Sequence, residues 1–209
     1  MADSITLYLK AEWLKLFEGL PVNESLLDAY FIHLIFAYTE SHRFYHRPEH
    51  LHHLIGLLHE SQVSDIPVFL AAFYHDYIYV PGKNDNELKS AEIAQAQLEK
   101  LGVNVTVIER VCDLIIMTKT HQISGQDNVA ATFLDADMSI IGAPTEIYSS
   151  YVDSIRKEFN SVPKFFFNRG RRKFLSALLM QERIFITDWF YEKFETQARE
   201  NIAWEIRNF

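Results

Sequence analysis

The residues best suited to chemistry are an adjacent histidine and aspartate, His75 and Asp76, which follow the apolar run 68–74. Burying a neutral imidazole and a carboxylate together is costly unless a partner compensates them. A divalent metal ion binds both kinds of ligand at once. The doublet therefore predicts a metal site.

Two other segments carry residues of the same kinds. Upstream, residues 45–50 read Tyr-His-Arg-Pro-Glu-His, and downstream, residues 133–137 read Phe-Leu-Asp-Ala-Asp. Each segment adjoins a hydrophobic stretch, which would hold its side chains in place. A mixed set of imidazole and carboxylate ligands suits Mn, Fe, Co, Ni or Zn, and also Mg, and the spacing does not choose among them.

Longer motifs extend this pattern along most of the chain. They are Arg43-x-Tyr-His46-x-x-x-His50, Phe73-x-His-Asp76, Asn86-Glu87-x-x-Ser-Ala91, Leu134-Asp-Ala-Asp137-x-x-x-Ile-Gly142, Tyr148-x-x-Tyr151, Ile155-Arg156-x-Glu158 and Gly170-Arg171. With them the chain resembles the HD-domain superfamily of metal-dependent phosphohydrolases, and more closely a group of stand-alone HD proteins described as predicted hydrolases. The resemblance implies an all-α fold, a single HD-type helical domain over residues 1–209, and metal ligands His50, His75, Asp76 and Asp137.

The resemblance also assigns roles to two residues. The stretch from Ala136 to Ser139 is similar to the Ala-Asp-Leu-Ser stretch of cyclic-nucleotide phosphodiesterases, in which the aspartate after alanine binds the metal. That implies Asp137 as the ligand, with Asp135 as the alternative. The phosphodiesterase motif Tyr-His-Asn-x-x-His likewise implies that His46 protonates the leaving oxygen, which contributes roughly 10²–10⁴-fold in rate.

Further candidates complete the predicted site. Glu87, expected at a helix start, belongs with His46 and Asp76 in the catalytic set. It would orient the attacking water or bind a second ion through water, and ordinary charge at a helix N-terminus explains it equally well. His121 would bind phosphate or a second metal ion, although related binuclear sites use more histidines than this one. Arg43 and Arg171 are expected to bind substrate, because guanidinium groups match phosphate geometry.

The resemblance predicts a metal-dependent phosphohydrolase that uses metal-activated water on a small phosphate ester, a nucleotide among the candidates. Two alternatives stay open. A di-iron oxygenase of the HD type would need a binuclear site, and a regulatory HD protein would bind metal without turnover.

Composition limits the classes of protein. A chain of 209 residues with 48% hydrophobic residues suits one domain with a sizeable core. A net charge of −8 argues against general nucleic-acid binding. No apolar run reaches the roughly 18 residues of a membrane span, and the start shows no signal peptide. With a single cysteine, these features predict a cytoplasmic protein.

The spacing of apolar residues predicts helices throughout. Pro67 should open the helix that carries the doublet, and a last helix should run from Asp188 to about Arg207. Gly170 is expected to interrupt a helix, and His33 to lie in the core. Residues 165–167, all phenylalanine, predict a pocket wall or a homodimer contact. Arg156 and Glu158 are read as a structural ion pair.

Overall fold

The structure is a computed structural model that describes residues 2–123 and 125–209. Within those ranges the chain forms ten α-helices and one 3₁₀ helix, η1, and no strand. The elements are α1 (Ala2–Lys15), α2 (Glu24–Tyr38), α3 (Pro48–Glu60), α4 (Ile66–Tyr74), α5 (Asn86–Lys100), α6 (Val105–Met117), α7 (Asn128–Met138), η1 (Ser139–Gly142), α8 (Thr145–Glu158), α9 (Lys164–Leu179) and α10 (Asp188–Arg207). The predicted all-α fold is confirmed for the described part of the chain.

Short polar side chains fix where several helices begin. Asn23, Asp65, Asn104 and Asp127 each accept a hydrogen bond from a backbone N–H in the first turn of α2, α4, α6 and α7. These caps satisfy N–H groups that have no partner within the helix. The starts of α4 and α7, two of the helices that carry the candidate site, are thus specified by local sequence.

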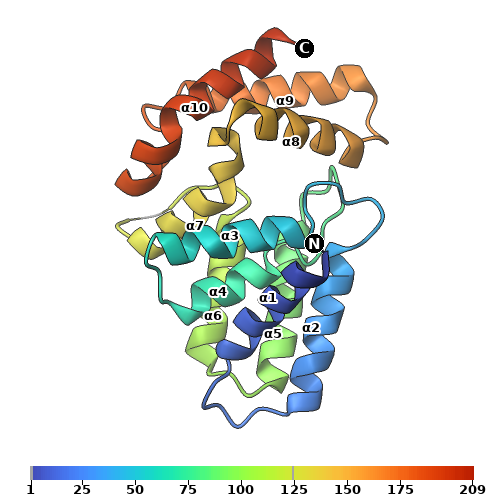
Figure 1. Cartoon of the computed structure of the whole chain (residues 1–209), viewed down its shortest axis with the longest axis vertical. Coiled ribbons are helices and arrows are strands. Elements are labelled where there is room, and N and C mark those ends of the chain that lie inside the picture. Colours follow the sequence, from blue (N-terminus) through green and yellow to red (C-terminus); the bar gives the residue numbers. More distant parts are fainter. Residues whose placement is uncertain (1, 124) are drawn as a thin grey trace.

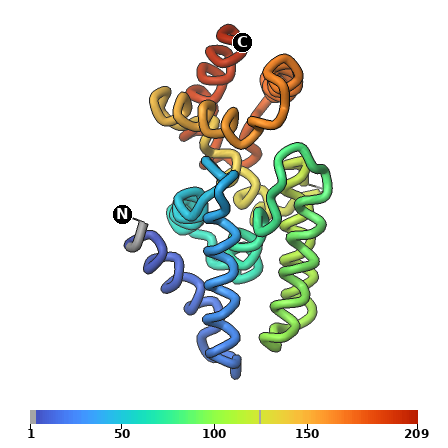
Figure 2. The backbone as a smooth tube through the Cα atoms, turned by 90° about the vertical axis from the view of Figure 1, so that its right-hand side faces the viewer, coloured from blue at the N-terminus to red at the C-terminus, as the bar shows by residue number. Residues whose placement is uncertain are grey.

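Helices α3, α5, α6 and α7 pack against α4, and Figures 1 and 2 show the C-terminal helices gathered at the opposite end of the molecule. Helices α1, α2, α5 and α6 lie toward one end of the molecule, and α8, α9 and α10 form the other end, with α7 and η1 between them (Figure 1). Every residue of α4 from Val68 to Tyr74 is buried. One hydrophobic cluster runs from α1 to α10, so both ends of the molecule share a core.

Two details of the helices differ from the sequence predictions. Helix α4 ends at Tyr74, with His75 as its C-cap, so Asp76 lies just beyond the helix. His75 itself keeps helical dihedrals, with φ −56° and ψ −38°, and its N–H still donates to the carbonyl of Ala71. Gly170 does not interrupt α9, which runs through it; a glycine weakens a helix by only about 1 kcal/mol.

The last helix and the position of His33 also test the sequence predictions. The last helix has the predicted bounds. His33 is exposed on α2 rather than buried, because it lies on the face turned away from the buried residues Phe31 and Leu34. No helix among the described residues is long and apolar enough to cross a membrane.

Candidate metal centre

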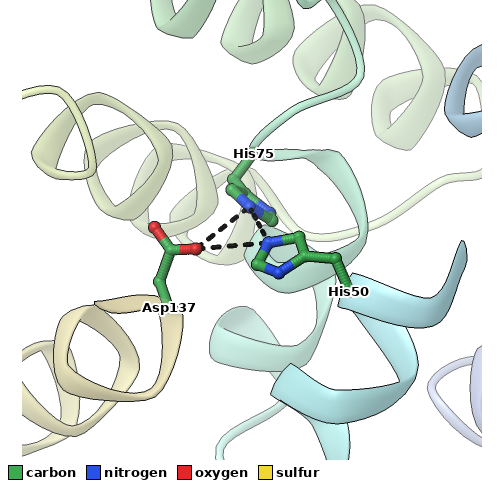
Figure 3. Close-up of side chains that lie close together, drawn as sticks. All are labelled: His50, His75 and Asp137. Carbon is green, nitrogen blue, oxygen red and sulfur yellow. Dashed lines mark hydrogen bonds and ion pairs between the residues drawn. The ribbon is translucent and has the colours of Figure 1, made fainter. Parts of the chain in front are cut away.

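Three side chains from separate helices meet at the junction of α3, α4 and α7 (Figure 3). His50 Nε2 lies 3.2 Å from His75 Nε2 and 3.3 Å from Asp137 Oδ1, and His75 Nε2 lies 3.5 Å from the same oxygen. Both histidines are buried. These residues form a group that could hold a metal ion.

The chemistry of the three atoms fits a cation. His75 Nδ1 lies 2.8 Å from the carbonyl oxygen of Ala72. A carbonyl can only accept, so Nδ1 carries a hydrogen, and in the neutral ring Nε2 then has the lone pair that a metal ion would use. Ligands about 2.0–2.1 Å from a tetrahedral ion lie about 3.3 Å from one another, close to the distances here. The donor set therefore suits a transition metal or zinc.

Asp76, the fourth predicted ligand, stands beside this group but is not a member of it. Its Oδ2 lies 3.1 Å from His75 Nε2 and 4.0 Å from His50 Nε2. Arg43 holds the backbone there, because its guanidinium donates to the carbonyl oxygens of Asp76 and Tyr77. Burial alone would raise the pKa of the Asp76 carboxyl, but the neighbouring histidines, His75 foremost, lower it.

Asp137, and not Asp135, reaches the histidines. Asp135 accepts hydrogen bonds from the N–H groups of Ile186 and Thr187, at 2.8 and 2.7 Å. It thereby fastens the segment that leads into α10. Burial raises its pKa, despite these hydrogen bonds. The two aspartates are one residue apart, on α7, yet one faces the histidines and the other the start of α10.

His46 approaches the group from the loop before α3. Its Nε2 lies 3.8 Å from Asp76 Oδ2, and its Nδ1 lies 2.7 Å from Glu158 Oε2. Burial alone would lower the pKa of His46, but the Asp76 and Glu158 carboxylates raise it. Because Glu158 accepts at Nδ1, the other ring nitrogen is the one turned toward the metal group.

Glu158 is the residue that sequence reasoning missed. Its Oε1 accepts the N–H groups of Phe44, Tyr45 and His46, while Oε2 accepts from His46 and from the Tyr79 hydroxyl. The predicted ion pair with Arg156 is wrong, since Arg156 donates instead to backbone carbonyls of residues 159 and 162. Only the spacing Ile155-Arg-x-Glu158 in the sequence marked this position.

His121 and Glu87 occupy different surroundings. His121 Nε2 lies 3.1 Å from Asp137 Oδ2, the oxygen of that carboxylate not shared with His50 and His75. Its φ of +50° is uncommon for a residue other than glycine. Glu87 stands in the first turn of α5, and its buried Oε2 has no hydrogen-bond partner among the described residues. No described interaction joins Glu87 to the histidines.

Both arginines predicted to bind phosphate are engaged within the protein. Arg43 is buried, and its guanidinium donates to the carbonyl oxygens of Asp76 and Tyr77. Arg171 pairs with Glu205 at 2.9 Å and donates to the Tyr151 hydroxyl. The Tyr151 ring in turn contacts Tyr45, 4.7 Å between centroids. Their roles toward a substrate stay predictions.

Comparison with known proteins found no matching family model, no matching curated protein and no matching solved structure. The resemblance to HD-domain proteins therefore stays a prediction, and the candidate site rests on its geometry.

Proposed function

We propose that this protein is a metal-dependent phosphohydrolase of the HD type, acting on a small phosphate ester. The observation that carries the proposal is the convergence of His50, His75 and Asp137 within 4.8 Å of one another, with Asp76 against His75. Nitrogen and oxygen donors from distant parts of the chain rarely converge in a core without a cation to bind them.

In this proposal, separate residues bind the ion and transfer the proton. His50, His75, Asp76 and Asp137 hold the ion, which supplies Lewis acidity to activate water and to neutralise charge on the phosphoryl oxygens. His46 delivers a proton from Nε2 to the leaving oxygen. Glu158 holds His46 in the tautomer and orientation that this step requires.

Two further residues have supporting roles in the proposal. The unpartnered Oε2 of Glu87 is available to orient water. His121, whose Nε2 lies near the second oxygen of Asp137, would bind a phosphoryl group or help to hold a second ion. Arg43 stabilises the site indirectly, because its guanidinium donates to the backbone carbonyl of Asp76.

The first test is metal content. Elemental analysis of the purified protein should give one or two ions per chain, and Asp137→Asn should lose them. His33→Ala is the matched control, because it removes an exposed histidine on α2 and should leave the metal unchanged. A wild-type protein that takes up none of Mn, Fe, Co, Ni, Zn or Mg would overturn the proposal. Two irons per chain would favour the oxygenase alternative.

The second test is activity on 4-nitrophenyl phosphate and bis(4-nitrophenyl) phosphate with the bound metal restored. His46→Asn should lower kcat roughly 10²–10⁴-fold at unchanged metal content. A fully metal-loaded wild type that hydrolyses neither ester nor a panel of nucleotides would leave a metal-binding protein without this activity.

A further inference from the structure

A cavity of about 560 Å³ opens beside the candidate metal centre, between the start of α3, η1, the start of α8 and α10. Cavities of about 300–1,000 Å³ are typical of small-molecule sites. Its apolar walls come from Phe44, Ile140, Pro144, Ile147 and Phe194. None of the candidate catalytic or substrate-binding residues predicted from the sequence lines it.

The cavity and the metal group share a wall. His50 lines the cavity while its Nε2 faces His75 and Asp137. Tyr45 also lines it, and its ring lies 4.9 Å from that of His46 and 5.0 Å from that of His50, between centroids. His50 is thus common to both, with Tyr45 beside it, and a phosphate ester that spans the metal centre and this space must pass beside these two side chains.

The charges around the cavity indicate which organic group fits. Arg47 and Glu49 at its rim lie 3.7 Å apart and offset each other. His53, whose pKa is lowered by burial and by His50, is a neutral neighbour of the Ser139 hydroxyl at 3.2 Å. The walls thus offer no uncompensated cation for a second phosphate, and the aromatic rings of Phe44, Tyr45 and Phe194 favour an apolar ring.

Another opening near the metal group is a poorer candidate. A cavity beside His121 and Asp135 measures about 190 Å³, below the usual range for a small-molecule site. It is about a third of the volume of the first cavity.

We propose that the cavity between α3, η1 and α8 binds the apolar, ring-sized alcohol group of the substrate, which makes the protein a phosphatase for aryl or similarly hydrophobic phosphomonoesters. This inference rests on the proposed function. In the reaction, water and the ester give inorganic phosphate and the free alcohol: the bond from phosphorus to the alcohol oxygen breaks, water supplies the new oxygen on phosphorus, and His46 protonates the released alcohol.

The experiment compares three proteins: wild type, Ile147→Trp, which fills the cavity from its exposed rim, and Ile32→Trp, the same change on exposed α2. Calorimetry measures binding of 1-naphthol, and of 1-naphthylmethylphosphonate against methylphosphonate, with the metal bound. In wild type and Ile32→Trp, naphthol should bind and the naphthyl phosphonate should bind at least tenfold tighter than methylphosphonate. Ile147→Trp should lose both effects at unchanged metal content and unchanged methylphosphonate affinity.

The two proposals fail in different ways. No naphthol binding to wild type, or equal binding to Ile147→Trp, overturns the cavity assignment even if small esters are hydrolysed. Naphthol binding that Ile147→Trp abolishes, without hydrolysis of 1-naphthyl phosphate, overturns the phosphatase while the cavity stands as a site for apolar rings. Faster hydrolysis of glycerol 2-phosphate or nucleoside monophosphates than of 1-naphthyl phosphate overturns the substrate class.

Discussion

Replacing Glu158 with glutamine should weaken the protein measurably. The carboxylate accepts five hydrogen bonds, at 2.7 to 3.0 Å, from three backbone N–H groups, His46 and Tyr79. A glutamine side chain keeps one oxygen for the backbone groups, but turns an NH₂ toward His46 and Tyr79. The change therefore removes the negative charge and loses the acceptor that holds His46.

The pKa of Glu158 gives the size of the effect. Burial alone would raise that pKa, but the hydrogen bonds and charge of His46 and the backbone N–H groups lower it from 4.5 to about 2. At 1.36 kcal/mol per pH unit, this corresponds to about 3 kcal/mol. Because the folded-state pKa is depressed, this stability is fully present above pH 4.5 and is lost as the pH falls toward 2. At pH 3.5 about 2 kcal/mol should remain.

Urea unfolding, followed by circular dichroism, measures the contribution of Glu158 to the free energy of unfolding. Glu158→Gln should lower the free energy of unfolding by about 3 kcal/mol at pH 7, and the deficit should shrink by about 1 kcal/mol at pH 3.5. Glu92→Gln, an exposed glutamate on α5, is the matched control and should change it by less than about 0.5 kcal/mol at either pH. A deficit below about 0.5 kcal/mol at pH 7, or one independent of pH, would refute the reasoning.

Three further predictions test other parts of the structure. Asp135→Asn should lower the free energy of unfolding in urea by about 1–3 kcal/mol, because it weakens the side chain that accepts the N–H groups of Ile186 and Thr187. The metal content should stay intact. Loss of metal would contradict the position of Asp135 outside the metal group. Gly142→Ala should lower the free energy of unfolding by about 1–3 kcal/mol, because an added Cβ would lie 2.6 Å from Phe194 Cβ. Gly56→Ala, with open space around it on α3, is the control and should be neutral or stabilising. Equal effects of the two changes would show that η1 and α10 are not in tight contact. Mn²⁺ at a concentration of about a hundred times its Kd should stabilise the protein by about 2.7 kcal/mol and raise Tm by about 5–10 °C. A chelator should reverse this shift, and His75→Ala should not show it. An unchanged wild-type Tm at saturating metal would argue against a metal site in the folded state.

The sequence alone was sufficient for features that depend on local interactions. Apolar spacing predicted the helix that Pro67 opens and the last helix, because a helix start depends on interactions within a few residues, such as the cap that Asp65 provides for α4. The kinds of residue in the doublet and its two flanking segments also pointed to the stretches that contain His50, His75 and Asp137, because imidazole and carboxylate groups are costly to bury without a partner. The choice of Asp137 over Asp135 came from the resemblance to phosphodiesterases.

Tertiary structure decided which of these residues meet. The resemblance favoured Asp137 over Asp135, but it is the packing of α7 between the histidines and the start of α10 that places Asp137 against His50 and Asp135 against the N–H of Ile186. Glu158 reaches His46 across 112 positions of the chain, and the cavity beside His50 has walls from four elements. Contacts of this kind depend on how the helices pack, and no local pattern encodes them.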